Sequence, residues 1–224
     1  MMGLYLTFNM SFQAVLFDMD GVIVDNLPYH VEAWLLFCER KGIPLTKELF
    51  YKELNGMNSK DTFEWFYKKE MTRAEVEVLE EEKELLYREF YAEHRKPAKG
   101  LLAFLTELRS RGLKTALATS AGPGNIDFIV DGLGIRDQFD AIIGGAEVTK
   151  GKPDPEIYLK AAALVGVEPK DCWVIEDSLQ GIASGLAAGA RVVGITTSHT
   201  AEELAHTQVI APHFIGLYDQ IASL

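Results

Sequence analysis

The sequence predicts an α/β protein with a doubly wound parallel sheet, covered by helices on both faces and interrupted near its start by an inserted bundle of helices. The first observation is that short apolar runs alternate with segments of helical periodicity from Gly100 onward. The second is that the chain between the first apolar run, AVLFD at residues 14–18, and Gly100 is helical in pattern, aromatic and charged. We therefore expect residues 1–27 and 96–224 to form an α/β core, and residues 28–95 to form a helical cap domain.

The elements of the predicted core follow one another with short connections, which favours a parallel sheet. The helix after Gly100 ends at Gly112, and a later helix begins at Pro155 and ends at Gly166, the residue types that commonly flank helices. Pro97 and Gly100 end the helical insert. The expected order after the first strand and the insert is helix 101–112, strand 113–120, helix 125–134, strand 139–145, helix 155–166, strand 172–177, helix 179–189 and strand 191–197.

Composition and charge exclude several classes of protein. The 224 residues are 48% hydrophobic, and 33 acidic against 22 basic side chains give a formal net charge of -11. This charge repels nucleic acids and anionic membranes, so we expect neither as a partner. Cys38 and Cys172 each lie in an apolar segment, which indicates neither a disulfide framework nor a thiolate metal site and suits the cytoplasm.

The opening ten residues, MMGLYLTFNM, are apolar, but they carry no basic region and are too short to span a bilayer. We interpret them as an N-terminal extension, with Met10 as an alternative start. The sequence is compatible with a monomer and does not fix the oligomeric state.

Polar side chains follow the predicted strands at the carboxyl edge, where parallel sheets bind ligands. Separate segments of the chain contribute to this edge, so we expect their side chains to meet there. In chain order they are Asp18, Asp20, Thr119, Ser120, Lys152, Glu176 and Asp177.

Four carboxylates at one edge of a sheet need compensation. At a separation of ~4 Å and an effective dielectric of ~20, each like-charge pair costs about 4 kcal/mol, and Lys152 alone does not offset this repulsion. Oxygen ligands without a nearby cysteine or histidine favour Mg2+ over zinc. Because Mg2+ commonly shares a phosphate oxygen, the sequence predicts a small phosphorylated metabolite as the partner.

Each of these residues also has a purely structural interpretation. The two acids after the first strand could form a polar turn, whereas a calcium loop is excluded because its sixth and twelfth positions would be Ile23 and Tyr29. Thr119 could be a turn hydroxyl, and Lys152 a surface residue of a proline-rich loop. The helix after the last acidic pair could be capped by Asp177 or its neighbour. Complementary chemistry from four separate strand ends nevertheless favours a chemical role.

Four motifs, DMDGVIVD, ATS, GKPDP and IEDSLQGI, resemble the ordered motifs of the haloacid dehalogenase superfamily of phosphotransferases. They span Asp18 to Ile182, and the helical insert after the first motif resembles the small four-helix cap of that family. The resemblance covers nearly the whole chain after Met10. It implies a Rossmann-like core with a cap domain that selects the substrate.

The resemblance implies a role for each motif residue. Asp18 is expected to attack phosphorus and form an aspartyl phosphate, and Asp20 to exchange protons with the leaving and attacking oxygens. Thr119 and Lys152 are expected to hold the phosphoryl oxygens. The expected Mg2+ ligands are Asp18, the backbone carbonyl of Asp20, Glu176 and Asp177.

The segments YHVEAW, after the first motif, and EDSLQGI look most like β-phosphoglucomutase and its sugar-phosphatase relatives. His30 matches a histidine at the hinge of the mutase cap, and a helix-surface histidine is the structural alternative. We expect the cap to close over the cleft and exclude water. The residues expected to contact the substrate are Ser120, His30, Asn55 and Lys83.

Lys83 interrupts an apolar helical stripe with a charge. It aligns with a substrate-facing lysine of the mutase cap. Alternatively, its stem packs on the interior of the cap while its charge reaches water near Glu80. The apolar members of the stripe are Val76, Leu79, Leu86 and Phe90.

Two departures from the mutase pattern separate the candidate functions. The mutase cap clamps a second phosphate with an arginine and a lysine, where this chain has Asn55 and Ser59, with Lys60 adjacent. After its second motif the mutase presents a lysine and an asparagine, where this chain has the segment AGPGN. The sequence leaves open whether Asn125 takes the place of the mutase asparagine. Fewer cationic contacts weaken the binding of a bisphosphate.

We therefore rank first a Mg2+-dependent phosphatase of small phosphorylated metabolites, with sugar phosphates as the expected class. A β-phosphoglucomutase-type isomerase that converts glucose 1-phosphate to glucose 6-phosphate is the alternative. A non-catalytic phosphate-sensing module is a third hypothesis, but receiver domains lack a helical insert after their first strand.

Overall fold

The structure, a computed structural model, describes residues 12–54 and 57–224. Its described strands form a six-stranded sheet in the order β3-β2-β1-β4-β5-β6, and each neighbouring pair is parallel. The direction of winding therefore changes between β1 and β4. The strands are β1 (Ala14–Phe17), β2 (Lys114–Ala118), β3 (Ala141–Ile143), β4 (Cys172–Glu176), β5 (Arg191–Ile195) and β6 (Val209–Ala211).

Helices connect and cover these strands. Within the described ranges, we find no helix whose length and apolar character would let it cross a membrane. A π-helical segment, Phe50–Leu54, continues α2. The α-helices are α1 (Leu27–Lys41), α2 (Lys47–Leu49), α3 (Ser59–Tyr67), α4 (Arg73–Tyr91), α5 (Leu101–Ser110), α6 (Pro123–Val130), α7 (Glu156–Val165), α8 (Leu179–Ala187) and α9 (Leu217–Ala222), and the 3-10 helices are Arg136–Gln138, Gly145–Glu147 and Pro169–Asp171.

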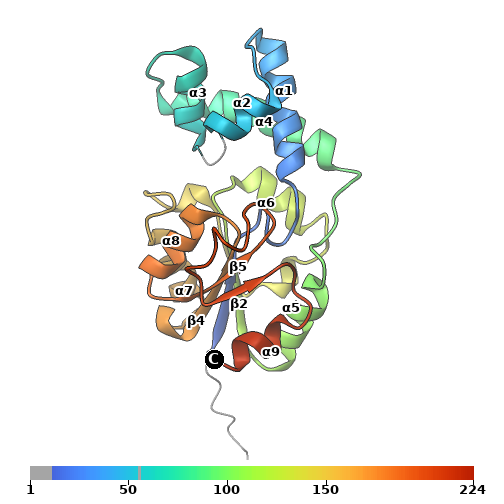
Figure 1. The fold of residues 1–224 in the computed structure, drawn as a ribbon, viewed down its shortest axis with the longest axis vertical. Helices are drawn as coiled ribbons and strands as arrows, with labels where there is room; N and C mark the ends of the chain where they lie inside the picture. The colour runs from blue at the N-terminus through green and yellow to red at the C-terminus, as the bar shows by residue number, and fades with distance from the viewer. Residues whose placement is uncertain (1–11, 55–56) are drawn as a thin grey trace, which may run out of the picture.

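The sheet is buried between two layers of helices (Figure 1). In β1, Val15 and Phe17 pack into the cluster that includes α5, α6 and α9, whereas Ala14 and Leu16 pack into the cluster with α7 and α8. This alternation is the two-residue period of a strand, and burial on both faces explains why β1 is apolar throughout.

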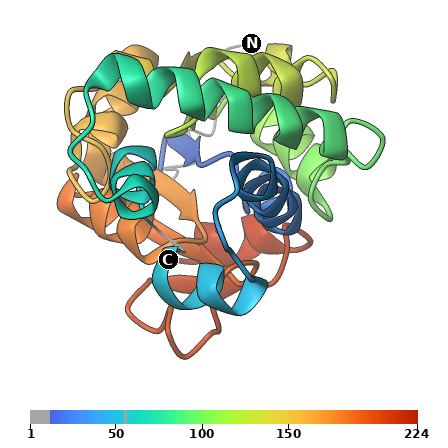
Figure 2. The same ribbon diagram turned by 90° about the horizontal axis from the view of Figure 1, so that it is seen from above.

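Helices α1 to α4 lie beyond the carboxyl ends of the strands, and the view from above shows α4 crossing one side of this group (Figure 2). Aromatic side chains fill its interior, where the ring centroid of Trp34 lies 5.9 Å from that of Phe37 and 5.2 Å from that of Phe63. Thr72 begins α4 with a reciprocal capping box to Glu75. The helical insert is thus a packed unit facing the edge of the sheet, and its limits as a domain, at residues 28 and 95, stay predictions.

The predicted fold class is confirmed, with two additions and one correction. Neither β6 nor α9 was identified from the sequence. β6 gives a weak pattern because it is only three residues long and two of them, Val209 and Ile210, are partly exposed. The predicted stripe on α4 was wrong at Phe90, which is 39% exposed, while Tyr87 and Tyr91 are buried. A helix has 3.6 residues per turn, so a series with a period of 3.5 drifts off the buried face.

Candidate active site

Asp18 follows β1 directly, where the sheet changes its direction of winding, and is buried. The Nζ atom of Lys152 lies 2.6 Å from Oδ1 of Asp18 and 2.6 Å from Oε1 of Glu176. Burial acts to lower the pKa of Lys152, but the two carboxylates outweigh it and hold the pKa above its usual value. One charged ammonium therefore joins acids from two neighbouring strands.

Glu176 is the last residue of β4 and is fully buried, with both of its oxygens engaged. Oε1 accepts a hydrogen bond from the hydroxyl of Tyr158 at 2.8 Å, in addition to the ammonium. Oε2 accepts from the backbone N–H groups of Asp177 and Ser178, each at 3.1 Å. A Cβ atom at Gly181 would lie 1.7 Å from Oε1, so α8 approaches this carboxylate only because it has a glycine there.

Asp177 lies at the start of the loop into α8, and Ser178 rather than Asp177 caps that helix. Oδ2 of Asp177 accepts hydrogen bonds from the hydroxyls of Ser198 and Thr197, the latter at 3.3 Å. Gly21 has φ +77°, and a Cβ atom there would lie 1.9 Å from Oδ2 of Asp177. The glycine of the first motif is therefore required both for the turn of the backbone and for the space that Asp177 occupies.

The buried acids can hold a divalent cation. Asp18, Glu176 and Asp177 each offer a carboxylate oxygen, and these atoms lie within 4.8 Å of one another. Burial raises the pKa of Asp18 well above its usual value despite Lys152, and burial together with Glu176 raises the pKa of Asp177 to about 7. Three carboxylates against one ammonium leave excess negative charge, and an all-oxygen donor set of this kind suits Mg2+.

Asp20 is held by residues of the helical insert and of the segment that leads into it. Nδ2 of Asn26 donates to Oδ1 of Asp20 at 2.6 Å and contacts the hydroxyl of Tyr87 at 2.7 Å. The ring of His30 stacks on Tyr87 with centroids 3.8 Å apart, and its Nε2 lies 3.9 Å from Oδ1 of Asp20. Burial acts to raise the pKa of Asp20, but the contacts with His30 and Asn26 outweigh it and lower the pKa below its usual value.

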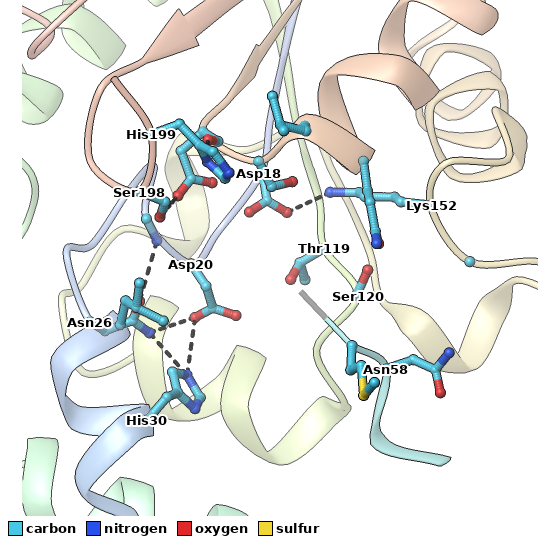
Figure 3. A pocket seen from close by; sticks show the side chains of 18 residues that line it. Asp18, Asp20, Asn26, His30, Asn58, Thr119, Ser120, Lys152, Ser198 and His199 are labelled. Carbon is cyan, nitrogen blue, oxygen red and sulfur yellow. Dashed lines mark hydrogen bonds and ion pairs between the residues drawn. The ribbon is translucent and has the colours of Figure 1, made fainter. Parts of the chain in front are cut away.

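A cleft of about 610 Å³ lies between the edge of the sheet and the helical insert. Figure 3 shows that Asp18, Thr119 and Lys152 surround its floor, while His30 and Asn58 approach from the insert. Thr119 is buried and Ser120 is exposed. The described residues lining the cleft are Asp18, Asp20, Gly21, Asn26, Leu27, His30, Met57, Asn58, Thr119, Ser120, Gly151, Lys152, Asp177, Ser178, Leu179, Gln180, Ser198 and His199.

The four residues predicted to contact the substrate have different positions. Ser120 and His30 line the cleft, so His30 is not a helix-surface histidine. Lys83 is 4% exposed, and its ammonium lies 3.2 Å from Nδ1 of His30 and contacts Glu84. It reaches neither the cleft nor, as the alternative interpretation had it, water. Asn55 lies outside the described residues.

Sequence reasoning missed several residues at the cleft, and Asn26, Ser198 and His199 are three of them. Ser198 holds Asp177, and Nδ1 of His199 lies 2.9 Å from the carbonyl oxygen of Asp177. Both follow β5, so the rule that ligands bind beyond the carboxyl ends of parallel strands would have identified them had it been applied to that strand. Asn26 does not follow a strand, so this rule does not identify it, although Asp20 and His30 are near it in the sequence and only Tyr87 is distant.

An open parallel sheet with a hydroxyl, a lysine and a cluster of acids at its switch point defines an enzyme of the hydrolase or phosphotransferase class. The family model of the haloacid dehalogenase-like hydrolases matches residues 12–189, and the chain belongs to this family.

Relatives within the family include enzymes of two kinds. The β-phosphoglucomutase of Bacillus subtilis (strain 168) is 35% identical over 192 residues, which cover 82% of this chain and 83% of that protein. The phosphorylated carbohydrates phosphatase of Thermotoga maritima is 31% identical over 199 residues, which cover 83% and 86%. Among solved structures, a HAD hydrolase of family IA, variant 3, from Entamoeba histolytica has a TM-score of 0.86 and 32% identity, covering 91% of this chain and 94% of that one.

Proposed function

We propose that this chain is a Mg2+-dependent phosphatase that hydrolyses small sugar phosphates through an aspartyl phosphate. The observation that carries the proposal is the pairing of Asp18 with Lys152 at 2.6 Å on the floor of a cleft of about 610 Å³. A buried carboxylate beside a fixed ammonium has the geometry of a nucleophile next to a group that neutralises phosphoryl oxygens. The names of the two relatives, a carbohydrate phosphatase and a sugar-phosphate mutase, support the substrate class.

In the first step an oxygen of Asp18 attacks phosphorus, and the bond between phosphorus and the leaving oxygen breaks. Asp20 donates a proton to that leaving oxygen. Lys152 and the hydroxyl of Thr119 offset the charge on the phosphoryl oxygens during the transfer. Mg2+, when bound by Asp18, Asp177 and the carbonyl of Asp20, neutralises further negative charge.

In the second step water attacks the aspartyl phosphate, and the bond between phosphorus and Asp18 breaks to release inorganic phosphate. Asp20 takes the proton of the water and so regains the proton that it gave to the leaving oxygen in the first step. Glu176 is the fourth predicted metal ligand. Because both of its oxygens already accept hydrogen bonds, including one from Lys152, we assign it the additional role of fixing that lysine.

The lining of the cleft favours a phosphatase over a mutase. Among its described lining residues Lys152 is the only lysine or arginine, and the insert contributes His30, Met57 and Asn58. A mutase must hold a second phosphate away from the nucleophile, which calls for further cationic donors. A β-phosphoglucomutase-type isomerase remains the second candidate, supported by the relative that is 35% identical.

The test is phosphate release from a panel of sugar monophosphates with Mg2+, for the wild type and for Asp18→Asn. We expect Asp18→Asn to reduce turnover by on the order of 10⁴-fold or more, because the nucleophile is lost. Asp219→Asn, the same change at an exposed acid of α9, is the matched control and should keep full activity. Equal rates for wild type and Asp18→Asn would refute the proposal.

A second assay separates the two candidates. The same proteins are given β-glucose 1-phosphate and glucose 1,6-bisphosphate, and the formation of glucose 6-phosphate is measured. Release of phosphate from monophosphates without isomerisation supports the phosphatase, whereas isomerisation that depends on the bisphosphate would assign the chain to the mutases.

A further inference from the structure

One side chain of the core connects the helical insert to the sheet domain at the contact between α4 and α6. Asn125, in the first turn of α6, is 5% exposed. Its Nδ2 donates to Oε2 of Glu84 at 2.7 Å, and its Oδ1 accepts from Nη1 of Arg88 at 2.8 Å. Both partners lie on α4, and Figure 1 shows α6 at the top of the core, directly below the insert. A single amide thus pairs with an acid and a base of the opposite helix.

The hydrogen bonds continue from Asn125 toward the cleft. The other oxygen of Glu84 accepts from the ammonium of Lys83, whose Nζ also lies 3.2 Å from Nδ1 of His30. His30 in turn lies 3.9 Å from Asp20, through Nε2. A chain of polar contacts therefore runs from α6 through α4 and α1 to the carboxylate of Asp20.

These contacts fix the orientation of the His30 ring. The ammonium of Lys83 lies 3.2 Å from Nδ1, and Nδ2 of Asn26 lies 3.4 Å from Nε2, the nitrogen that faces Asp20. Both ring nitrogens therefore have a fixed neighbour, one on α4 and one in the segment that leads into α1. Glu84 keeps the ammonium in place, because Lys83 is buried and needs an anionic partner.

We propose that Asn125 is a positioning residue that couples the seating of the helical insert on α6 to the orientation of His30 and Asp20. Its contacts with Glu84 and Arg88 exist only while α4 lies on α6, so the orientation of the His30 ring is held when the insert covers the cleft and released when it lifts. The inference rests on the proposed function in so far as Asp20 is the proton-transfer group of the reaction.

The local sequence supports this role for the AGPGN segment. Pro123 begins α6, and Gly124 leaves room for Arg88, since a Cβ atom there would lie 3.1 Å from Nη1 of that arginine. An asparagine suits the position because it both donates to Glu84 and accepts from Arg88, whereas an aspartate could only accept. Asn125 does not belong to the described lining of the cleft, so it does not replace the phosphate-binding asparagine of the mutase pattern.

The kinetic test compares Asn125→Leu, which keeps the size of the side chain and removes both hydrogen bonds, with Asp127→Asn. Asp127 is on the same helix as Asn125, and its substitution removes an exposed ion pair with Arg136, which lies beyond that helix. For a sugar phosphate, whose alkoxide leaving group needs a proton, we expect kcat to fall about tenfold in Asn125→Leu. For p-nitrophenyl phosphate, whose leaving group needs none, we expect a change of less than about twofold. Asp127→Asn should match the wild type on both substrates.

Equal losses on the two substrates in Asn125→Leu would make the residue merely structural and overturn the inference, as would no loss on either. Asp18→Asn is assayed beside it. Inactivity of Asp18→Asn on both substrates supports the proposed function independently of how Asn125→Leu behaves.

A second measurement needs no turnover. In protein labelled with 15N-histidine, the ring nitrogen shifts report the surroundings of each ring, and His30→Gln identifies the signal among the five histidines. We expect the same His30 shifts in the wild type and in Asp127→Asn, and displaced His30 shifts in Asn125→Leu. An unchanged His30 signal in Asn125→Leu would overturn the coupling even if the proposed function failed.

Discussion

The floor and the roof of the cleft are built in different ways. The floor is made by Asp18 and Glu176, at or beside the ends of the paired strands β1 and β4, and by Lys152, which reaches both acids from the loop between β3 and α7. The roof is made by His30 and the residues of α4 behind it, which are aligned only by side-chain contacts between helices. The acids of the floor are therefore recognisable in the sequence, while the chemistry of the roof depends on how its helices pack.

The largest effect should come from the floor. Lys152→Met removes the ammonium that two buried acids share, so we expect kcat to fall by on the order of 10³-fold through lost charge stabilisation. The free energy of unfolding should fall by about 3 kcal/mol, because Asp18 and Glu176 lose their counter-charge. Phosphate release and denaturant unfolding measure the two effects.

Lys160→Met is the control for that change, since Lys160 makes a half-exposed ion pair with Glu156 on α7. It should alter stability by less than about 1 kcal/mol and leave turnover unchanged. A similar loss of activity in both lysine variants would contradict the distinction between a fixed floor and an ordinary surface.

The next effect concerns the turn that closes the floor. Gly21→Ala places a methyl group 1.9 Å from Oδ2 of Asp177 on a backbone with φ +77°, and we expect a loss of about 2–4 kcal/mol in the free energy of unfolding. Displacement of Asp177 should also abolish the rise in melting temperature on addition of Mg2+, because ligand binding to the native state is what stabilises it.

Gly42→Ala separates backbone strain from the clash. Gly42 ends α1 with φ +68°, and nothing lies within 4 Å of a Cβ atom there. It should cost only about 1 kcal/mol and keep the full thermal response to Mg2+. If Gly21→Ala also keeps that response, the close approach of Gly21 to Asp177 does not define the metal site.

The same contrast explains how much the sequence could predict. Asp18 and Lys152 were predictable because apolar runs locate strands and parallel strands deliver their following residues to one edge. Lys83 was misplaced because its partner is Glu84, one residue away, whereas helix patterns identify neighbours three or four residues apart. The role of Asn125 depends on the contact between α4 and α6, which no local periodicity encodes.

The smallest effect tests whether the roof acts as a unit. Glu84→Gln keeps the shape of the side chain but removes the charge that holds Lys83, and we expect a loss of about threefold to tenfold in kcat on sugar phosphates. If Glu84 and Asn125 belong to one network, the double variant should be no worse than the poorer single variant, a coupling of about 1 kcal/mol.

Glu84→Gln combined with Asp219→Asn on α9 should instead be additive within about 0.5 kcal/mol, because these residues share no contact in the structure. Each pair of substitutions forms a double-mutant cycle of four proteins: the wild type, the two single variants and the double variant. The four are compared by kcat for the sugar phosphate and by the free energy of unfolding. Additivity in both cycles would mean that the roof is a set of independent contacts. Coupling confined to the Glu84 and Asn125 pair would mean that the helices above the cleft transmit the position of α4 on α6 to Asp20, a property that the strand-built floor neither needs nor has.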